Sequence, residues 1–354
     1  MKKKCLIISI SIILLISLIA IINKNSKEYI MQDGIMLALT LDGEKITEYP
    51  EVTNYQVKTT CENGKGKWLV DEWKLAVEEV TGNVVCNIEF TSNPTSLKSE
   101  VESKANTNTN GYRYSGKQPD NWVWFNNEMW RIIGSIPVSQ SDGTEINLVK
   151  IIRANSIGEL IYDINDNYIY WNTSELDTIL NSYYYGKLDL TGERPCLGSS
   201  TNTYALCNYE EIGISSEATD YYGKMVKSVN WNISSVNSSG DTISTAFTQE
   251  KKTKASRKIG LMSASDYGYA SGQTAAKLVD LDDYEQNNWL YIQPEAILNP
   301  FKTADVWYIT EYGRLAYNGS ATSGRAVRPV VYLDPSVYII SGDGTEGNPY
   351  QIGM

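Results

Sequence analysis

The chain has 354 residues, of which 42% are hydrophobic, and a formal net charge of −11. It is long enough and apolar enough to bury a core, and its acidity argues against nucleic acid as a partner because like charges repel. It contains no histidine, which excludes Ser-His-Asp and Cys-His nucleophilic sites, histidine zinc ligands and histidine general bases.

The amino-terminal residues predict a membrane anchor. After three lysines, CLIISISIILLISLIAII runs from Cys5 to Ile22 without a charge. As a helix this run is long enough to cross a hydrocarbon core of about 30 Å, and it lacks a small-residue cleavage site, a lipoprotein cysteine at its end and a pilin-like leader. We expect residues 1–28 to be a cytoplasmic tip and single-pass anchor in the cell membrane, with residues 5–22 in the bilayer and the bulk of the chain extracellular. A cleaved signal peptide is the alternative.

Residues 29–92 are predicted to form a small β-sandwich-like module. Segments such as IMLALTLDG and NVVCNIEFT alternate apolar and polar residues, and Gly- and Asn-containing turns separate them. Trp68 and Trp73 are expected in its core. The module has the size of a stalk or spacer, and a binding role of its own is the alternative. Residues 93–110 are predicted to be a polar linker with short helical order around LKSEVESK.

Four cysteines follow the apolar run, namely Cys61, Cys86, Cys196 and Cys207. Four cysteines allow three pairings. Proximity in sequence favours Cys61–Cys86 and Cys196–Cys207, and each bond would stabilise the fold by about 2–4 kcal/mol. Four free thiols are the alternative. A zinc site is not supported, because the chain has neither a CxxC pair nor a histidine.

Residues 111–354 are predicted to form a larger domain that opens with strands. A hairpin turn is expected at Asn126 and Asn127, because asparagine tolerates the positive φ that tight hairpins need. A helix is predicted within TSELDTILNSYYYGKL, where Ser174 and Asp177 form a capping-box-like pair.

A second helix is predicted over EATDYYGKMVKSV, with Tyr222, Met225, Val226 and Val229 as its apolar stripe. The basic string EKKTKASRK that follows is predicted to be a solvated loop, with contact to an acidic polymer as the alternative. IGLMSASDYGYA is predicted to be a strand and then a helix capped by Ser265. The remainder alternates strands and turns.

Five strings occur in order along this larger domain: WFNNEMWRIIG, GLMSASDYGYA, VWYITEYGRLAYNG, VRPVVYL and SGDGTEGNPY. Together they resemble an uncharacterised group of Gram-positive bacterial surface proteins. The W-x-x-T-E-Y … G … V-R-P-V pattern is also similar to bacterial C-type-lectin-like domains, the class that includes formylglycine-generating enzymes. The resemblance covers Gly111 to Met354. It implies an α+β fold with antiparallel sheets whose first and last strands pair, two flanking helices and long loops that form a variable binding face.

The resemblance also implies roles for single residues. Arg328 is expected to be structural, packing or pairing beneath the sheet. Formylglycine-generating enzymes use a reactive cysteine pair late in the domain, whereas the last cysteine here is Cys207, so that activity is not expected. Sugar-binding lectins of this class use a calcium site. Gln293-Pro294-Glu295 resembles the first part of the motif that forms this site. The later Trp-Asn-Asp is missing, and Glu295 is expected to be a surface carboxylate.

No cofactor is expected. The string DINDN from Asp163 resembles the start of a calcium-binding EF-hand loop, but Tyr168 stands at the required glycine and Ser174 at the final glutamate. A polar turn is the prediction there. Asp343 is likewise predicted to lie in a turn, with weak calcium binding as the alternative.

The aromatic composition favours binding, since 25 tyrosines and 9 tryptophans stand against 4 phenylalanines. Tyrosine and tryptophan suit wet recognition faces, although sheets also favour aromatic residues. The candidate ligand contacts are Tyr184, Tyr185, Tyr221 and Tyr222.

We therefore expect a membrane-anchored extracellular binding or adhesion protein, not an enzyme, with a glycan or protein as its ligand. The first alternative is an envelope-glycan enzyme that works through carboxylates alone, because the spacing of 42 Asp and Glu residues in sequence does not give their separation in space. The second is a structural spacer or pilus-like surface protein.

Overall fold

The chain forms two compact units, the first ending at Asn93 and the second running from Pro94 to Met354. The computed structural model describes residues 29–50, 55–70, 72–164, 170–189, 208–237, 240–273, 276–279, 287–301 and 305–354. Within these ranges, no helix combines the length and the apolar character that a membrane crossing requires. The predicted anchor at residues 5–22 lies outside them.

The first unit is built from strands, as the alternating pattern predicts. Its strands are β1 (Ile30–Gln32), β2 (Ile35–Leu41), β3 (Glu44–Ile46), β4 (Gln56–Glu62), β5 (Lys65–Leu69), β6 (Lys74–Glu78) and β7 (Val85–Thr91). β2 and β7 pair in parallel at the centre of one sheet, with β1 and β3 on β2 and β4 on β7. β5 and β6 form a separate antiparallel ribbon.

The core of the first unit contains the predicted Trp68 and the predicted disulfide, whereas Trp73 is only half-buried. Trp68 is buried and packs edge-on against Phe90 and Trp73. Cys61 and Cys86 lie opposite each other on β4 and β7 and form a disulfide bond, which confirms this pairing. Cys196 and Cys207 lie outside the described residues.

The residues that were expected to form a linker pack with the second unit. They include helix α2 (Leu97–Lys104), whose Leu97 and Val101 are fully buried in the core of that unit. The prediction of a linker is wrong because α2 has only these two apolar residues on its buried face, and its other residues are polar. The helical order around LKSEVESK is present, but as packed structure.

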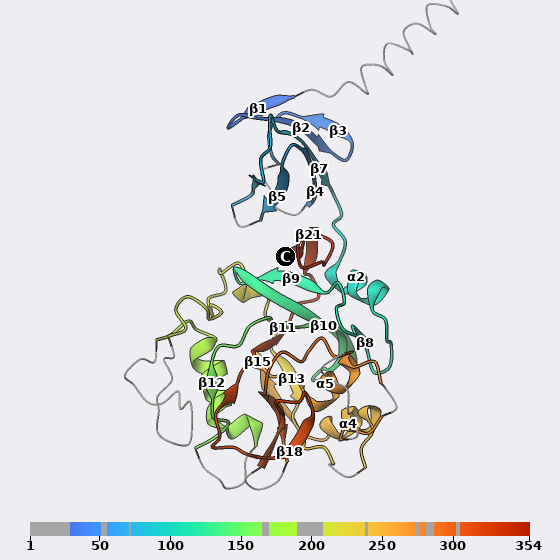
Figure 1. Cartoon of the computed structure of the whole chain (residues 1–354), viewed down its shortest axis with the longest axis vertical. Coiled ribbons are helices and arrows are strands. Elements are labelled where there is room, and N and C mark those ends of the chain that lie inside the picture. The colour runs from blue at the N-terminus through green and yellow to red at the C-terminus, as the bar shows by residue number, and fades with distance from the viewer. Residues whose placement is uncertain are drawn as a thin grey trace, which may run out of the picture. The chain divides into compact units, whose positions relative to one another are not determined.

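The second unit is α+β, with many strands and few helices (Figure 1). Its largest sheet has eight strands in the order β15-β20-β11-β10-β9-β22-β21, with β8 also paired to β10. These are β8 (Tyr112–Arg113), β9 (Trp122–Phe125), β10 (Glu128–Ser139), β11 (Glu145–Arg153), β15 (Ile259–Gly260), β20 (Val330–Tyr332), β21 (Tyr338–Ser341) and β22 (Tyr350–Gly353).

Two smaller sheets complete the strands of this unit. A five-stranded sheet has the order β12-β19-β16-β17-β18, and a ribbon pairs β13 with β14. Their bounds are β12 (Glu159–Leu160), β13 (Val229–Asn232), β14 (Lys254–Arg257), β16 (Glu295–Pro300), β17 (Asp305–Ile309), β18 (Leu315–Ser320) and β19 (Arg325–Ala326).

The short helices are η1 (Trp171–Thr173), α3 (Glu175–Thr178), η2 (Ile179–Tyr184), η3 (Gly223–Met225), α4 (Ile243–Glu250) and α5 (Ala264–Ala270). Three of them, α3, α4 and α5, begin at a side chain that caps them. The Ser174 side chain accepts a hydrogen bond from the Asp177 backbone N–H at 3.1 Å, as predicted for the start of α3. α3 continues directly into η2, a π-helix.

Two helix predictions are wrong in detail. The helix expected over EATDYYGKMVKSV is replaced by the 3-10 turn η3 and strand β13. Its four apolar residues are all buried, but a turn followed by a strand buries them as well as a helix would. Ser263, not Ser265, caps α5, through a reciprocal capping box with Asp266.

The hairpin between β9 and β10 agrees with the sequence. Asn126 and Asn127 adopt φ values of 54° and 59°, in the left-handed region that asparagine tolerates. β10 then pairs with β11 along most of its length, and Figure 1 shows it as a long arrow beside β9. β22 lies parallel to β9 on the other side.

Candidate functional site

The four candidate tyrosines divide into two core residues and two surface residues. Tyr184 and Tyr222 are buried and belong to the hydrophobic core of the second unit. Tyr185 and Tyr221 are partly exposed and pack against that core. Any contact with a ligand on this side of the unit therefore falls to Tyr185 and Tyr221.

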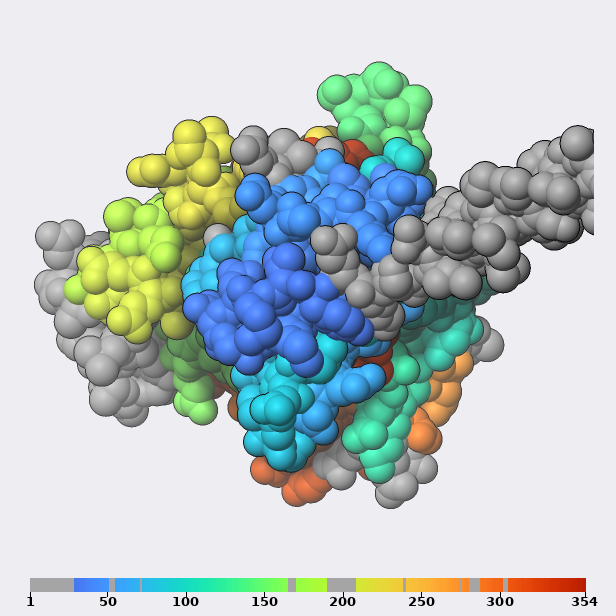
Figure 2. Space-filling view, turned by 90° about the horizontal axis from the view of Figure 1, so that it is seen from above, coloured from blue at the N-terminus to red at the C-terminus, as the bar shows by residue number. Residues whose placement is uncertain are grey.

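The local backbone explains why Tyr185 faces outward. The π-helix η2 ends at Tyr184, and the Tyr184 carbonyl accepts a hydrogen bond from the Ile214 N–H at 3.0 Å. The next residue, Tyr185, is extended and bridges Ile214. Figure 2 shows the two segments involved, yellow-green and yellow, side by side on one flank of the second unit. π-helical turns occur frequently at functional sites.

Each of the two partly exposed tyrosines has a lysine over its ring. Lys258 Nζ lies 5.5 Å from the centre of the Tyr185 ring, and Lys224 Nζ lies 5.2 Å from that of Tyr221. These distances are within the range of a cation–π contact. We name Tyr185, Tyr221, Lys224 and Lys258 the tyrosine–lysine surface. Asp220 links its two halves, since it precedes Tyr221 in the chain and acts electrostatically on Tyr185.

The electrostatics of this surface reflect partial burial. Burial lowers the pKa of Lys258, and the positive charge of Lys227 adds to the effect. Burial also raises the pKa of Tyr185, with a contribution from Asp220. Lys227 itself pairs with Asp334 at 2.9 Å. The lysines that lie over the tyrosine rings are therefore cations without a carboxylate at ion-pair distance, as far as the described residues go.

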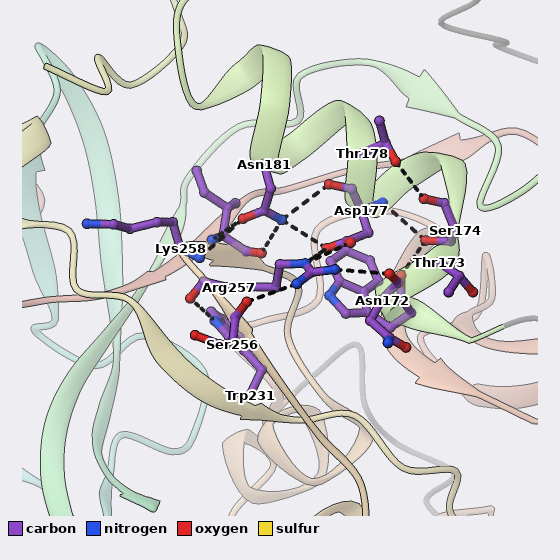
Figure 3. Close-up of polar contacts among 12 residues, drawn as sticks. Asn172, Thr173, Ser174, Asp177, Thr178, Asn181, Trp231, Ser256, Arg257 and Lys258 are labelled. Carbon is purple, nitrogen blue, oxygen red and sulfur yellow. Dashed lines mark hydrogen bonds and ion pairs between the residues drawn. The ribbon is translucent and has the colours of Figure 1, made fainter. Parts of the chain in front are cut away.

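A polar cluster beneath the surface fixes the position of Lys258 (Figure 3). Asp177 on α3 accepts from Arg257 Nε at 2.8 Å through both carboxylate oxygens. Burial raises the pKa of Asp177 although the Arg257 charge opposes this. Asn181 Oδ1 accepts from the backbone N–H groups of Lys258 and Ile259 at 3.2 and 3.0 Å. The cluster thus joins the helical segment to the backbone at Lys258, between β14 and β15.

A second group of charges is enclosed in the core. Asp266 accepts from Lys150 Nζ at 2.5 Å through Oδ2 and from Arg113 Nη1 at 2.7 Å through Oδ1. The side chains of all three are at most 4% exposed. The two cations hold the pKa of Asp266 well below its ordinary range, despite burial, and Asp266 raises the pKa of Lys150.

Glu250 shares a small cavity with this group. The cavity has a volume of about 10 Å³ and is lined by Lys150, Asp266, Ser263 and Glu250, among others. The Glu250 carboxylate accepts from the Ser265 backbone N–H at 2.9 Å and from its hydroxyl at 2.6 Å. Burial raises the pKa of Glu250 to about 7. α4 and α5, which carry Glu250 and Ser265, lie side by side (Figure 1).

Glu295 is buried rather than at the surface, so that prediction is wrong. Arg328 Nε donates to Glu295 Oε2 at 2.7 Å and Nη2 donates to Oε1 at 3.1 Å. Arg328 Nη2 also donates to the Leu290 carbonyl at 2.5 Å. Both charged side chains are 1% exposed. The pairing confirms the structural role expected of Arg328, and burial raises the pKa of Glu295 to about 7.

Asp343 lies in a turn, as predicted. Its Oδ1 accepts from the Thr345 backbone N–H at 3.0 Å and from the Thr345 hydroxyl at 2.7 Å. The part of the chain that the structure describes contains no cluster of three or more acidic or cysteine side chains that could hold a metal ion. The string DINDN lies mostly outside that part.

Several of these residues carried no signal that the sequence alone reveals. Lys150 and Asp266 are 116 positions apart, and Arg328 lies 33 positions from Glu295. The basic string EKKTKASRK contains Arg257 and Lys258. The prediction of a solvated loop there is wrong for Lys254–Arg257, which form β14, and for Glu250, which is buried at the end of α4.

Comparison with known proteins adds no assignment. No protein-family model, no curated protein and no solved structure matches the chain.

Proposed function

We propose that the protein is an extracellular binding protein, anchored in the membrane through residues 5–22, whose larger domain is C-type-lectin-like and binds an anionic glycan. The observation that carries the proposal is the tyrosine–lysine surface. It gathers two partly exposed aromatic rings and two cations on one flank of the second unit.

The chemistry of this surface suits an acidic sugar chain. The apolar face of a sugar ring packs on tyrosine. The Tyr221 hydroxyl donates to the Ile352 carbonyl at 2.8 Å, so toward a ligand it serves as an acceptor. Lysine supplies N–H donors and a positive charge to a carboxylate, sulfate or phosphate group, and Lys258 keeps donors for this besides the one given to the Val226 carbonyl at 2.6 Å. Cations gathered on one flank of a chain with a net charge of −11 would also steer an anionic ligand to that flank.

The carboxylate-only enzyme is supported less well. A glycosidase needs one carboxylic acid with a raised pKa and a second carboxylate, both facing the substrate. Glu250 and Glu295 have raised pKa values, but both are buried and hydrogen-bonded within the core. Because neither glutamate faces a surface where a substrate could bind, we favour binding over catalysis as the role of the second unit.

A glycan array probed with the full chain tests the proposal. We expect retention on glycans that carry carboxylate, sulfate or phosphate groups and not on their neutral counterparts. Lys258→Ala and Tyr185→Ala should each weaken binding by roughly tenfold, the effect of losing about 1.4 kcal/mol of contact energy. Lys252→Ala and Tyr312→Ala are matched controls, because both residues are exposed elsewhere in the same unit.

The controls should bind as the wild type does. If the control variants lost as much binding affinity as Lys258→Ala and Tyr185→Ala, the tyrosine–lysine surface would not be the binding site. Absence of any binding to acidic glycans would contradict the proposed ligand class itself.

A further inference from the structure

We propose that Lys150 and Asp266 condense in the folded protein to form an intramolecular amide bond between Nζ and Cγ, with Glu250 as the proton-transfer group. The inference concerns a covalent modification of the core and does not depend on the proposed ligand. It rests on the contact between the two reacting groups, their enclosure and the third carboxyl group in the same cavity.

The reacting atoms are already in contact. Lys150 Nζ lies 2.5 Å from Asp266 Oδ2. A nitrogen at this distance from one carboxyl oxygen is roughly 3–3.5 Å from the carboxyl carbon, which is the range of a near-attack conformer. Neither group can move far, since β11 holds Lys150 within the large sheet and a capping box holds Asp266 at the start of α5.

The surroundings keep water away from the pair. Lys150 Nζ lies 5.0 Å from the centre of the Trp231 ring and 5.2 Å from that of Tyr332. Both rings are buried. Exclusion of water prevents hydrolysis of an intermediate and strengthens the electrostatic contacts inside the site.

Glu250 is placed to move protons between the two groups. It lines the same cavity as Lys150 and Asp266, and its Oε2 accepts from the Ser265 hydroxyl, which lies 3.0 Å from the Ser263 hydroxyl. Because burial raises its pKa to about 7, a large share of Glu250 is protonated at neutral pH. A group that titrates near the working pH both gives and takes protons readily.

The reaction balances without any further reagent. One proton moves from the Lys150 ammonium to Asp266 Oδ2 along their hydrogen bond, which leaves an amine and a carboxylic acid. The amine lone pair forms the N–Cγ bond while the carbonyl electron pair moves to Oδ1. Glu250 gives its proton to the hydroxyl oxygen Oδ2 and takes one back from the nitrogen. The Cγ–Oδ2 bond then breaks, Oδ1 becomes the amide oxygen, and one water molecule is released.

Arg113 and the cavity fit the course of this reaction. Arg113 Nη1 donates to Oδ1 at 2.7 Å, where negative charge develops when nitrogen attacks, and stays as a donor to the amide oxygen. The cavity of about 10 Å³ is close to the smallest space that holds one water. Asn232 also lines the cavity. Its Oδ1 is buried and has no hydrogen-bond partner among the described residues, so it can accept a hydrogen bond from the released water.

Enclosure also makes the product favourable. Groups held in a near-attack geometry react as if one were present at roughly 10⁵–10⁸ M, far above the concentration of water. The amide replaces two buried charges by one neutral group, which relieves their desolvation. Arg113 opposes the reaction in two respects, since it keeps Asp266 ionised and loses its carboxylate partner when the amide forms. The reaction needs to occur only once in each molecule, so a rare neutral pair is sufficient.

Mass spectrometry of the full chain tests the proposal. After reduction and denaturation, the protein should be lighter than its sequence by the mass of one water molecule. Trypsin should fail to cut after Lys150, and the peptide that contains Lys150 should stay joined to the peptide that contains Asp266. A protein of full mass, or one that trypsin cuts after Lys150, would overturn the proposal.

Glu250→Gln tests the proton-transfer role separately. The glutamine keeps the size and the acceptor oxygen of Glu250 but gives up no proton, so we expect the full mass and cleavage after Lys150. Glu159→Gln, at an exposed position of β12, should lose water as the wild type does. Circular dichroism confirms that both variants fold. Water loss in Glu250→Gln at the wild-type rate would exclude Glu250 from the reaction.

Discussion

Arg328 and Glu295 show what a buried charge requires of its neighbours. Two charges removed from water gain stability only when their geometry is close and their remaining polar atoms are bonded. Arg328 meets this condition with two contacts to Glu295 and one to the Leu290 carbonyl. The pair therefore specifies the arrangement of the core more than it stabilises it.

Removal of one partner of this pair should be costly. Arg328→Met leaves Glu295 buried without its cation, and we expect a loss of about 3–5 kcal/mol in the free energy of unfolding. Urea denaturation followed by tryptophan fluorescence measures this. The double variant Arg328→Met, Glu295→Leu should recover most of the loss. If the double variant were as unstable as Arg328→Met, the cost would come from packing rather than from unpaired charge.

Glu250 predicts a pH dependence of stability. Its pKa is raised from 4.5 to about 7 in the folded state, so the folded state binds its proton more tightly than the unfolded state does. This contribution is complete below about pH 4.5 and is lost as the pH rises to about 7, with a total of up to about 3 kcal/mol. Stability curves at pH 5 and pH 8 measure it.

Glu250→Gln serves as the comparison, because glutamine does not titrate. Between pH 5 and pH 8, the free energy of unfolding should change less with pH in the variant than in the wild type, whatever the absolute stability of the variant. Nearby Asp266 and Lys150 titrate outside this range, because Lys150 lowers the pKa of Asp266 and Asp266 raises that of Lys150. An unchanged slope would show that Glu250 is not the titrating group.

Sequence reasoning at this scale succeeds for local contacts and fails for distant ones. The cap at Ser174 depends on a residue three positions away, and the turn at Asp343 on one two positions away. Glu295 was assigned to the surface because its partner lies on another strand, and no spacing in the sequence indicates that pairing. The same holds for Lys150 and Asp266.

At the scale of elements, short helices and turns depend on single side chains. Ser174→Ala removes the hydrogen bond to the Asp177 N–H at the start of α3, and we expect a loss of about 1 kcal/mol. Thermal unfolding measures the effect. Ser182→Ala is a matched control, because Ser182 is exposed within η2 and caps nothing. A loss of equal size in the control would mean that helix propensity, not the cap, is responsible.

The β9–β10 hairpin gives a test of backbone conformation. Asn127 has a φ of 59°, a conformation that β-branched residues adopt only at a cost of about 1–2 kcal/mol. Asn127→Val should therefore destabilise the protein by about that amount, whereas Asn127→Gly should be neutral or slightly stabilising. Chemical denaturation distinguishes the two. Similar losses in both variants would point to a side-chain contact of Asn127 instead.

The elements that were mispredicted share one physical cause. Tyr222, Met225 and Val229 have helical spacing, but η3 and β13 bury the same residues through a turn and a strand. Periodicity reports which residues are buried and not which backbone buries them. In α2, by contrast, the helix was expected and its burial was missed, because Leu97 and Val101 are too few to mark an apolar face.

At the scale of the whole molecule, the division into two units predicts two unfolding transitions. The disulfide bond belongs to the first unit and closes a loop with a sequence separation of 25. The double variant Cys61→Ala, Cys86→Ala should lose about 3 kcal/mol in the first unit. Differential scanning calorimetry should show one transition shifted down and the other unchanged, which serves as the internal control. A shift of both transitions would show that the units unfold together.

The division itself was close to what the sequence indicates, because turns and alternating strands stop near Thr91. The C-type-lectin-like fold of the larger domain stays a prediction. So do the anchor at residues 5–22 and the bond between Cys196 and Cys207, since these residues lie outside the described part. Local periodicity identifies strands, but it does not say which strands are neighbours, and fold names depend on that order.

The position of β22 sets an order of events for synthesis. Residues 350–353 lie between β9 and β21, inside the eight-stranded sheet, and pair in parallel with residues made more than two hundred positions earlier. Until the ribosome has released them, β9 has an open edge with unpaired backbone groups. Contacts this distant in sequence also form slowly. A growing chain therefore carries an open sheet edge at β9 while more than two hundred further residues are made.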